Sequence, residues 1–594
     1  MTRTVADALV DRLRTWQVPR VFGYAGDGID PLLAAFRRAD GEPEFVQTRH
    51  EEMAAFMATG HAKYTGWPGV CVATHGPGAI HLLNGLYDAK LDQQPVVALV
   101  GQVVSTALGS GYLQEIDLHS LFKDVCSQYV QTAVRPEQLP MLLDNAMRTS
   151  IAARTPTCLI LPHDLQRADA IDDLPHDHGM VPSAAVVGSP PKVEADADAV
   201  RRAAELLQQG RKVAVLAGRG AAGAAAEIAE LVELLGAGVT VSLLGKPVLD
   251  EGSPWHTGVM GHLGTTASAE LLGGCDTLFI VGCNDPWTEF YPEPGRARTV
   301  QLDLEARVVA SKYPVEVALV GDAATTLRAL IPQLRRTADR RWPEQVEQSV
   351  ARWHRLAEER AQTPADPLNP EAVVRALSGH LPDDARVAVD VGSATYWYAR
   401  HLALPAGVPA HVSSYLASMG CAMPYGLAAK LDAPSRPVVA LVGDGSMQMN
   451  GLLELITVAD RWQQWPDPRF VVLVLHNQDL NEVTWEQREM EGDPRYPASQ
   501  RVPDFPYASY AELLGLRGIR VDKPDQIEAA WTAAFTADRP TVIEAVVDPA
   551  VPLLPPGLDD AKLQKVFQGI DQEPDGHGAR SQVLRSQATE NYLD

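Results

Sequence analysis

A pattern of short apolar strands alternating with longer amphipathic stretches repeats through most of this 594-residue chain. Examples of the strands are VFGYA and TCLILP in the first third, KVAVLAG in the middle and RFVVLVLHN toward the end. Strands this apolar are buried on both faces, as in parallel sheets that are covered by helices. The sequence therefore predicts an α/β fold of doubly wound parallel sheets, whose ligands bind at the carboxyl ends of the strands.

Connectors divide the repeating pattern into three groups. One Pro- and Asp-rich connector lies at roughly 170–192, and the segment AQTPADPLNP precedes the third group. Because the chain is longer than one hydrophobic core usually serves, several domains are expected. The last segment has one apolar patch and then turns polar, which predicts a packed arm and a loose tail. The expected boundaries are 1–180, 192–340 and 366–552, followed by the C-terminal arm and tail, 553–594.

Charge and composition exclude several classes of function. The formal net charge of −24 argues against nucleic acid as a partner, because a phosphate polymer would be repelled. The chain contains no apolar run near the roughly 18 residues that a membrane span needs. Its first residues have the spacing of an amphipathic helix rather than of a signal peptide. The six scattered cysteines show neither metal-ligand spacing nor a disulfide framework, which favours buried thiols and a cytoplasmic protein.

The stretch VGDGSMQMNG, 442–451, combines a strand end, two glycines and the start of a helix. Glycines allow close backbone approach, and a helix N-terminus attracts phosphate. Asp444 would repel a bare phosphate, but it suits a divalent cation that bridges protein and diphosphate. Asn477 and Asp479 follow the next strand along the chain, and in a parallel sheet the two strand tips would be adjacent. Taken alone, Gly-Asp-Gly is also common in ordinary turns.

The spacing of Gly-Asp-Gly and the later asparagine resembles the signature of thiamine diphosphate enzymes. Over residues 3–550 the chain resembles the pyruvate oxidase and acetolactate synthase group, with His476 where the first asparagine of a pair is usual. The resemblance implies pyrimidine-binding, central FAD-type and diphosphate-binding domains in that order. It implies that Asp444, Asn477 and the Asp479 carbonyl hold Mg²⁺. The implied cofactor contacts of the third domain are Gly392, Ser393, Ala417, Met419, Gly443, Gly445, Ser446, Met447 and Asn477.

A glutamate in the first domain is the candidate catalytic acid. In QTRHEEMAAFMATG, Glu51 stands between a strand end and an apolar helix. A lone glutamate there is equally compatible with an exposed side chain that the helix dipole favours. The resemblance implies instead that Glu51, rather than Glu52, hydrogen-bonds the aminopyrimidine ring of the cofactor and promotes loss of its C2 proton.

A glycine-rich turn, Gly76-Pro77-Gly78, follows the next strand of the first domain. The resemblance places this turn beside the thiazolium ring of the cofactor. His75 before it is either a structural histidine or a proton donor to the carbonyl substrate. Gln114 matches a glutamine near the cofactor, although the aromatic residue that often precedes it is Leu113 here.

The middle domain carries a G-x-G-x-x-G pattern after a strand. The acidic residue that an NAD site requires about 20 positions later is absent, which argues against the alternative of an NAD(P) dehydrogenase. The resemblance implies FAD along the strand ends, although some relatives have lost it. The matching residues are Gly218, Arg219, Gly220, Leu244, Gly282, Asn284, Asp303 and Asp322.

The resemblance implies decarboxylation of a 2-keto acid, with pyruvate expected first. Oxidation of the resulting enamine through FAD, as in pyruvate oxidase or pyruvate:quinone oxidoreductase, is favoured over acetolactate synthase-like ligation of two keto acids. A non-catalytic thiamine diphosphate-binding relative is a further alternative. Glu482, Val483 and Glu486 are candidate substrate residues, or simply solvated helix residues, and Trp485 lies one position before the tryptophan of acetolactate synthases. The resemblance implies a homodimer or homotetramer, in which Glu51 and Asp444 of one active site belong to different chains.

Overall fold

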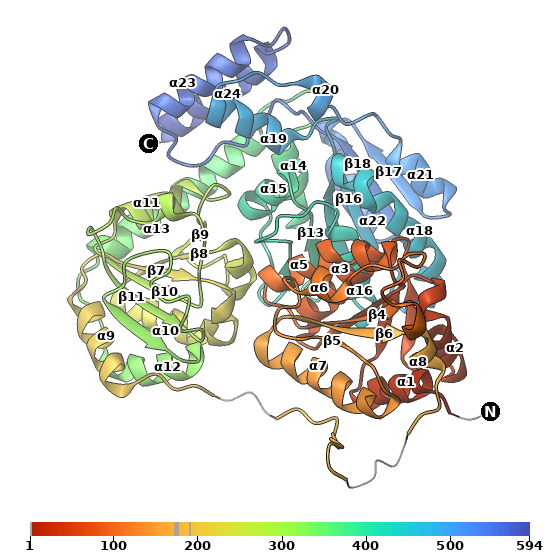
Figure 1. Ribbon diagram of the computed structural model, residues 1–594. Coiled ribbons are helices and arrows are strands. Elements are labelled where there is room, and N and C mark those ends of the chain that lie inside the picture. Colours follow the sequence, from red (N-terminus) through yellow and green to blue (C-terminus); the bar gives the residue numbers. More distant parts are fainter. Residues whose placement is uncertain (1–2, 172–176, 189–191, 594) are drawn as a thin grey trace. The chain divides into compact units, whose positions relative to one another are not determined.

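Three six-stranded sheets follow one another along the computed structural model, which describes residues 3–171, 177–188 and 192–593 (Figure 1). The strand orders are β2-β1-β3-β4-β6-β5, β12-β11-β10-β7-β8-β9 and β14-β13-β15-β16-β18-β17. Each sheet is parallel, so the predicted fold class is confirmed. Contacts divide the chain into two compact units, 1–190 with 411–440 and 446–470, and 191–410 with 441–445 and 471–594.

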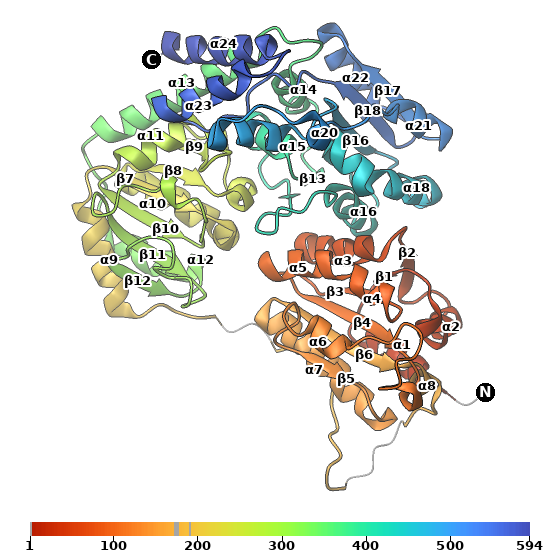
Figure 2. The same cartoon turned by 45° about the horizontal axis from the view of Figure 1, so that its top comes forward.

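The first sheet is covered by helices on both faces. Its strands are β1 (Arg20–Gly23), β2 (Glu44–Gln47), β3 (Gly69–Ala73), β4 (Val96–Gln102), β5 (Val130–Thr132) and β6 (Pro156–Pro162). Its helices are α1 (Val5–Thr15), α2 (Asp30–Arg38), α3 (Glu51–Thr65), α4 (Pro77–His81), α5 (Leu83–Leu91), α6 (Leu118–Phe122), α7 (Leu139–Ala153) and α8 (His163–Arg167). Alternate strand residues such as Val70 and Val72 share a core with α1, α2 and α7, whereas α3 and α5 lie on the other face (Figure 2). Leu9 and Leu13 of α1 are buried in that core, which confirms the amphipathic helix expected there.

The second sheet has the same layered arrangement. Its strands are β7 (Val213–Ala217), β8 (Gly238–Val241), β9 (His256–Val259), β10 (Thr277–Val281), β11 (Arg298–Asp303) and β12 (Val317–Val320). Its helices are α9 (Ala197–Gln209), α10 (Ala225–Leu235), α11 (Thr266–Gly274), α12 (Ala323–Leu330) and α13 (Arg341–Ala361). Val215 and Phe279 face α9, α10 and α12, whereas Leu216 and Ile280 face α11 and α13. This alternation is the reason that its strands are apolar throughout.

The third sheet brings three polar strand ends together. Its strands are β13 (Arg386–Val389), β14 (Ala410–His411), β15 (Val438–Gly443), β16 (Phe470–His476), β17 (Arg517–Val521) and β18 (Thr541–Val546). Its helices are α14 (Pro370–Leu377), α15 (Ser393–His401), α16 (Ala422–Asp432), α17 (Asp444–Ser446), α18 (Leu452–Arg461), α19 (Asn481–Glu486), α20 (Pro497–Gln500), α21 (Tyr507–Leu513) and α22 (Ile527–Phe535). Because β13, β15 and β16 are parallel neighbours, Gly392, Asp444 and Asn477 follow strands that end at one edge.

The C-terminal segment differs from the loose tail expected after the arm. It forms two helices, α23 (Asp560–Asp571) and α24 (His577–Leu593). Ala579 and Val583 of α24 are buried, and the Gln582 side-chain amide donates to the Pro364 carbonyl at 2.9 Å. A few apolar residues spaced one helical turn apart are enough to pack such a helix against the protein. The overall polarity of the segment does not reveal this spacing.

Two further expectations concern the cysteines and the membrane. All six cysteines are buried free thiols, as expected. Within the described ranges, the helices include none that is both long and apolar enough to cross a membrane.

Candidate active site

Glu51 is the first residue of α3 and is buried. The His50 side chain caps the helix, because its Nδ1 accepts a hydrogen bond from the Glu52 backbone N–H at 3.2 Å. Glu51 is only 8% exposed, so the alternative of a solvated glutamate at a helix end is wrong. A carboxyl removed from water needs a polar partner, which a later residue of the same chain provides.

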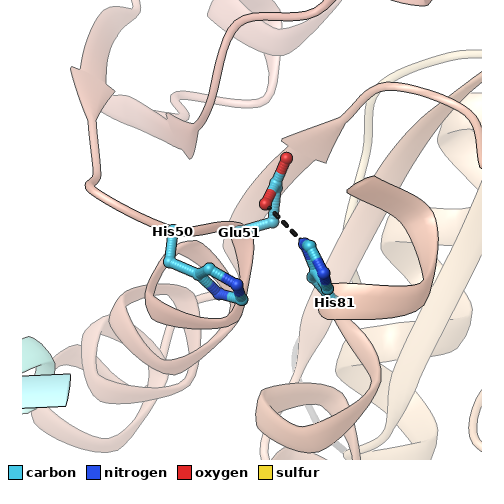
Figure 3. A group of neighbouring side chains, drawn as sticks. All are labelled: His50, Glu51 and His81. Carbon is cyan, nitrogen blue, oxygen red and sulfur yellow. Dashed lines mark hydrogen bonds and ion pairs between the residues drawn. The ribbon is translucent and has the colours of Figure 1, made fainter. Parts of the chain in front are cut away.

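That partner is His81, at the end of α4. Its Nδ1 lies 2.9 Å from Glu51 Oε2, and the two side chains point toward each other (Figure 3). The other carboxylate oxygen, Oε1, lies 3.1 Å from where a Cβ on Gly78 would stand, so glycine leaves room for the carboxylate. His81 was missed in the sequence, although it follows Gly78 by one helical turn in GPGAIH and therefore shares its side of α4.

The glycine-rich turn contacts the segment that carries Gln114. Gly76 has φ +60°, and a Cβ on it would stand 2.8 Å from the Gln114 Cβ. Both the backbone conformation and the close approach therefore require glycine. Gln114 itself is exposed and has φ +62°. The structure thus brings Gln114 beside the turn, while its predicted place near the cofactor and its catalytic role stay predictions.

His75 is buried, and its Nδ1 lies 3.0 Å from the Thr74 hydroxyl. Burial lowers its pKa from the ordinary value, although the charge of Asp27 opposes the shift. A neutral imidazole is therefore favoured near pH 7, and this agrees with the structural alternative. The role of His75 as a proton donor to substrate stays a prediction.

A buried ion pair holds the loop that carries Ala417 and Met419. Lys63 Nζ lies 2.5 Å from Asp92 Oδ2, with side chains 1% and 0% exposed. Asp92 also accepts the backbone N–H groups of Ser414 and Tyr415, each at 3.1 Å. Farther along the loop, Ala417 has φ +53°, an uncommon conformation for a residue with a side chain.

The third sheet positions Asp444 between two strand ends. One carboxylate oxygen accepts the backbone N–H groups of Asn477 at 3.0 Å and Gln478 at 2.6 Å. The other oxygen accepts the Gly445 N–H at 2.8 Å. Burial raises the pKa of Asp444 to about 6, against these hydrogen bonds. A carboxylate has roughly four positions that can accept a hydrogen bond, and three of them are occupied here. The remaining position is on Oδ1, the oxygen that accepts the Gly445 N–H, and it is available to a cation.

Asn477 and Asp479 have different roles beside Asp444. The Asn477 side-chain oxygen accepts the Asp479 N–H at 3.0 Å, which fixes the amide at the strand end. The Asp479 carboxylate is held by Arg495 Nε at 2.7 Å. Since that carboxylate already has a cationic partner, its backbone carbonyl is the better candidate for a metal ligand.

The donor set fits a hard cation with a diphosphate. A carboxylate, an amide oxygen and a carbonyl are the oxygen ligands that Mg²⁺ takes in proteins. A Cβ placed on Gly443 would have no atom within 4 Å, so a ligand can approach the backbone there. The Ser446 hydroxyl in α17 is buried and has no hydrogen-bond partner among the described residues. Met447 follows it as a buried residue.

The candidate substrate residues differ in exposure. Glu482 is half-buried, and burial, with a smaller effect of Glu486, raises its pKa to about 7. Its Oε2 lies 3.9 Å from where a Cβ on Gly392 would stand, near the start of α15 at Ser393. Val483 is 49% exposed. Trp485 is buried and donates from Nε1 to the Pro549 carbonyl at 3.2 Å, so it is a core residue.

The glycines of the middle domain contact one another. A Cβ on Gly220 would stand 2.8 Å from the Cα of Gly282, which itself has φ +56°. This backbone approach explains both glycines without a dinucleotide, and Gly223 has no neighbour within 4 Å that would require glycine. Of the other candidates for FAD, Asp322 caps α12, Asn284 pairs with Ser311, and Asp303 accepts the Glu305 N–H. Arg219 and Leu244 lie half-buried in the short 3-10 helices that follow β7 and β8.

Family models match all three sheets in order. The N-terminal thiamine pyrophosphate-binding domain matches residues 3–121, the central domain 200–330, and the C-terminal binding domain 390–545. YdaP of Bacillus subtilis, provisionally named a thiamine pyrophosphate-containing protein, is 34% identical over 557 residues, which are 93% of each chain.

The chain belongs to the thiamine pyrophosphate enzyme family.

Relatives of this thiamine pyrophosphate (thiamine diphosphate) enzyme include proteins named for two different reactions. Acetolactate synthase isozyme 2 large subunit of Escherichia coli is 31% identical over 573 residues, covering 94% of this chain and 98% of the relative. Pyruvate oxidase of Lactiplantibacillus plantarum is 28% identical over 551 residues, covering 92% and 89%. The chain is thus similar to enzymes of both reaction types.

Proposed function

We propose that this enzyme uses thiamine diphosphate and Mg²⁺ to decarboxylate a 2-keto acid, for which pyruvate is the leading candidate. The electrons released when the decarboxylated product is oxidised would pass to FAD. The observation that carries the proposal is the pairing of buried Asp444 with Asn477 at adjacent strand ends. When bound, thiamine diphosphate supplies the electron sink that lets carbon dioxide leave a keto acid.

The residues of the third sheet would bind the diphosphate end of the cofactor. Asp444, Asn477 and the Asp479 carbonyl would hold the cation, and Gly443 and Gly445 would admit the phosphates to the start of α17. Gly392 and Ser393 would contact the diphosphate from the neighbouring strand end. These residues bind and orient the cofactor and take no part in proton transfer.

The first domain would supply the acid-base group. Glu51 would hold a proton against the aminopyrimidine ring, and its burial keeps water from competing for that hydrogen bond. Ala417 and Met419 would hold the same ring from the loop anchored by Asp92. Gln114 would lie beside the Gly76-Pro77-Gly78 turn near the reacting carbon.

Oxidation is favoured over ligation by the surroundings of α19. Trp485 is buried against Pro549, so it does not select a second keto acid. The position of the selecting tryptophan holds Glu486. FAD would run along the strand ends of the middle sheet, past Gly218, Gly220 and Gly282. The absence of disulfides among the six thiols supports a reducing, cytoplasmic location.

The visible spectrum of the purified protein tests this assignment. A flavin spectrum that bleaches with pyruvate in the absence of oxygen is expected. A persistent yellow colour with acetolactate as product would replace oxidation by ligation. A colourless protein that still releases carbon dioxide from pyruvate would remove FAD from the proposal.

A further inference from the structure

The Glu51 carboxylate has one side-chain hydrogen-bond partner within the described part of the chain, and this partner is His81. The two side chains differ sharply in their access to water. The His81 side chain is 42% exposed, whereas that of Glu51 is 11% exposed. His81 is the last residue of α4, and its imidazole faces the Glu51 carboxyl from the more exposed of the two positions (Figure 3).

An imidazole has two ring nitrogens that can take up and release protons, which a simple hydrogen-bond donor lacks. Nδ1 of His81 faces Glu51 at 2.9 Å, and Nε2 is the second nitrogen of the same ring. Within the ranges that the structure describes, Nε2 has no protein partner, so it can exchange protons with water. A neutral histidine can accept a proton on one nitrogen and release another from the opposite nitrogen.

His50 lies against the same ring, with the two imidazole centroids 4.3 Å apart and the planes at 33°. His50, Glu51 and His81 each offer one possible metal-ligand atom, and these three atoms lie within 4.8 Å of one another. A metal site is therefore the alternative use of this cluster. However, Nδ1 of His50 already accepts the Glu52 N–H. In a neutral His50 the proton therefore resides on Nε2, which leaves no free lone pair for an ion.

We propose that His81 carries protons between the Glu51 carboxyl and bulk water. This inference rests on the proposed function, in which Glu51 exchanges a proton with the cofactor during turnover. In one direction, the Glu51 carboxyl proton moves to Nδ1 of His81 as the proton on Nε2 passes to a water molecule. One proton leaves the site for each proton that enters the ring, and no electrons are transferred.

Two variants separate proton transfer from mere positioning. His81→Asn keeps an amide N–H near the place of Nδ1, so it can orient Glu51 but cannot carry a proton. His81→Ala removes both capacities and leaves space for free imidazole. The control is His178→Asn, because His178 is exposed and lies outside the site.

The main readout is exchange of the C2 proton of bound thiamine diphosphate with deuterium, measured by acid quench and proton NMR. Both His81 variants should slow this exchange by about 100-fold, as expected for loss of a general acid-base group. Thiamine diphosphate affinity should stay within a few-fold of wild type, and imidazole should restore exchange in His81→Ala. Wild-type exchange in His81→Asn, or no rescue of His81→Ala, would overturn the proposal.

A second readout needs no cofactor. In the cofactor-free protein with nitrogen-15-labelled histidine, Glu51→Gln should shift the Nδ1 resonance of His81 and leave that of His178 unchanged. An unchanged His81 resonance would contradict the pairing itself. If wild-type protein fails to bind thiamine diphosphate while the resonance shift is present, the proposed function fails and the pair stands, so the two failures are distinguishable.

Discussion

The Oε1 atom of Glu454 accepts a hydrogen bond from the backbone N–H of Arg49 at 3.1 Å. Glu454 belongs to α18, and Arg49 lies two residues before Glu51 in the turn between β2 and α3. Glu454 is completely buried. Helix α18, which follows the Gly-Asp-Gly turn, is therefore tied to the turn that positions Glu51.

Replacing Glu454 should change how stability depends on pH. Burial raises its pKa from 4.5 to about 7, so the folded state favours the neutral carboxyl. The contribution of this carboxyl to the free energy of unfolding is fully present below pH 4.5. It is lost as the pH rises through 7, and the total loss is roughly 3 kcal/mol at most. Glu454→Gln keeps an acceptor for Arg49 and carries no charge. Its Tm relative to wild type should therefore rise between pH 5 and pH 8. A constant difference in Tm over this range would contradict the assignment of a buried, titrating carboxyl.

Replacing Asp444 should abolish metal-dependent cofactor binding. Asp444→Asn keeps the shape of the side chain but removes the negative charge that a divalent cation needs. Titration calorimetry with thiamine diphosphate and Mg²⁺ should show an affinity at least about 100-fold lower than wild type. Asp538→Asn, at an exposed aspartate of the same sheet region, should bind normally. Equal affinity in Asp444→Asn and wild type would remove Asp444 from the metal site.

Glu482 should make the KM for pyruvate depend on pH. Its pKa is raised to about 7, so the side chain is neutral below this value and anionic above it. The neutral acid can donate a hydrogen bond to a keto-acid carboxylate, whereas the anion repels it. The KM of wild type should rise several-fold from pH 6 to pH 8.5, and that of Glu482→Gln should stay nearly flat. The exposed Glu512→Gln should follow wild type. Parallel profiles for wild type and Glu482→Gln would place Glu482 away from the substrate.

The Lys63–Asp92 pair should show strong energetic coupling. Both side chains are buried, so removal of one leaves an uncompensated charge that costs about 3–5 kcal/mol. Lys63→Met and Asp92→Asn should each lower Tm markedly. The decrease in Tm of the double variant should be smaller than the sum of the two single decreases. The same single variants should weaken thiamine diphosphate binding, because Asp92 anchors the loop before Ala417. Additive effects in the double variant would show that the pair is not coupled.

Mixing inactive variants should test whether the active site is shared between chains. Glu51→Gln and Asp444→Asn should each be inactive as homo-oligomers. If each site takes Glu51 from one chain and Asp444 from another, a mixed dimer contains one site with neither change. Differently tagged, co-expressed variants should then recover up to about half of the wild-type activity per dimer. No recovery in purified mixed dimers would place both residues of a site on the same chain.

Much of the fold follows from local pattern. Apolar strands such as PVVALVG alternate with amphipathic helices, and this alternation alone indicates covered parallel sheets. Parallel strands place their carboxyl ends at one edge, so the contact between Asp444 and the backbone of Asn477 could be anticipated from two strand ends. The position of Glu51 between a strand and an apolar helix is likewise visible in the sequence, and its burial is not.

The contacts that define the site depend on packing between segments far apart in the chain. His81 reaches Glu51 across 30 positions, Glu454 reaches Arg49 across 405, and Asp92 reaches Ser414 across 322. Trp485 could have faced a substrate or the core, and its burial and its hydrogen bond to Pro549 decide this. The sequence by itself determined the sheets and the strand ends, because these depend on periodicity and parallel connection. The tertiary structure alone decided which side chain faces Glu51, because such contacts depend on how whole helices and strands pack.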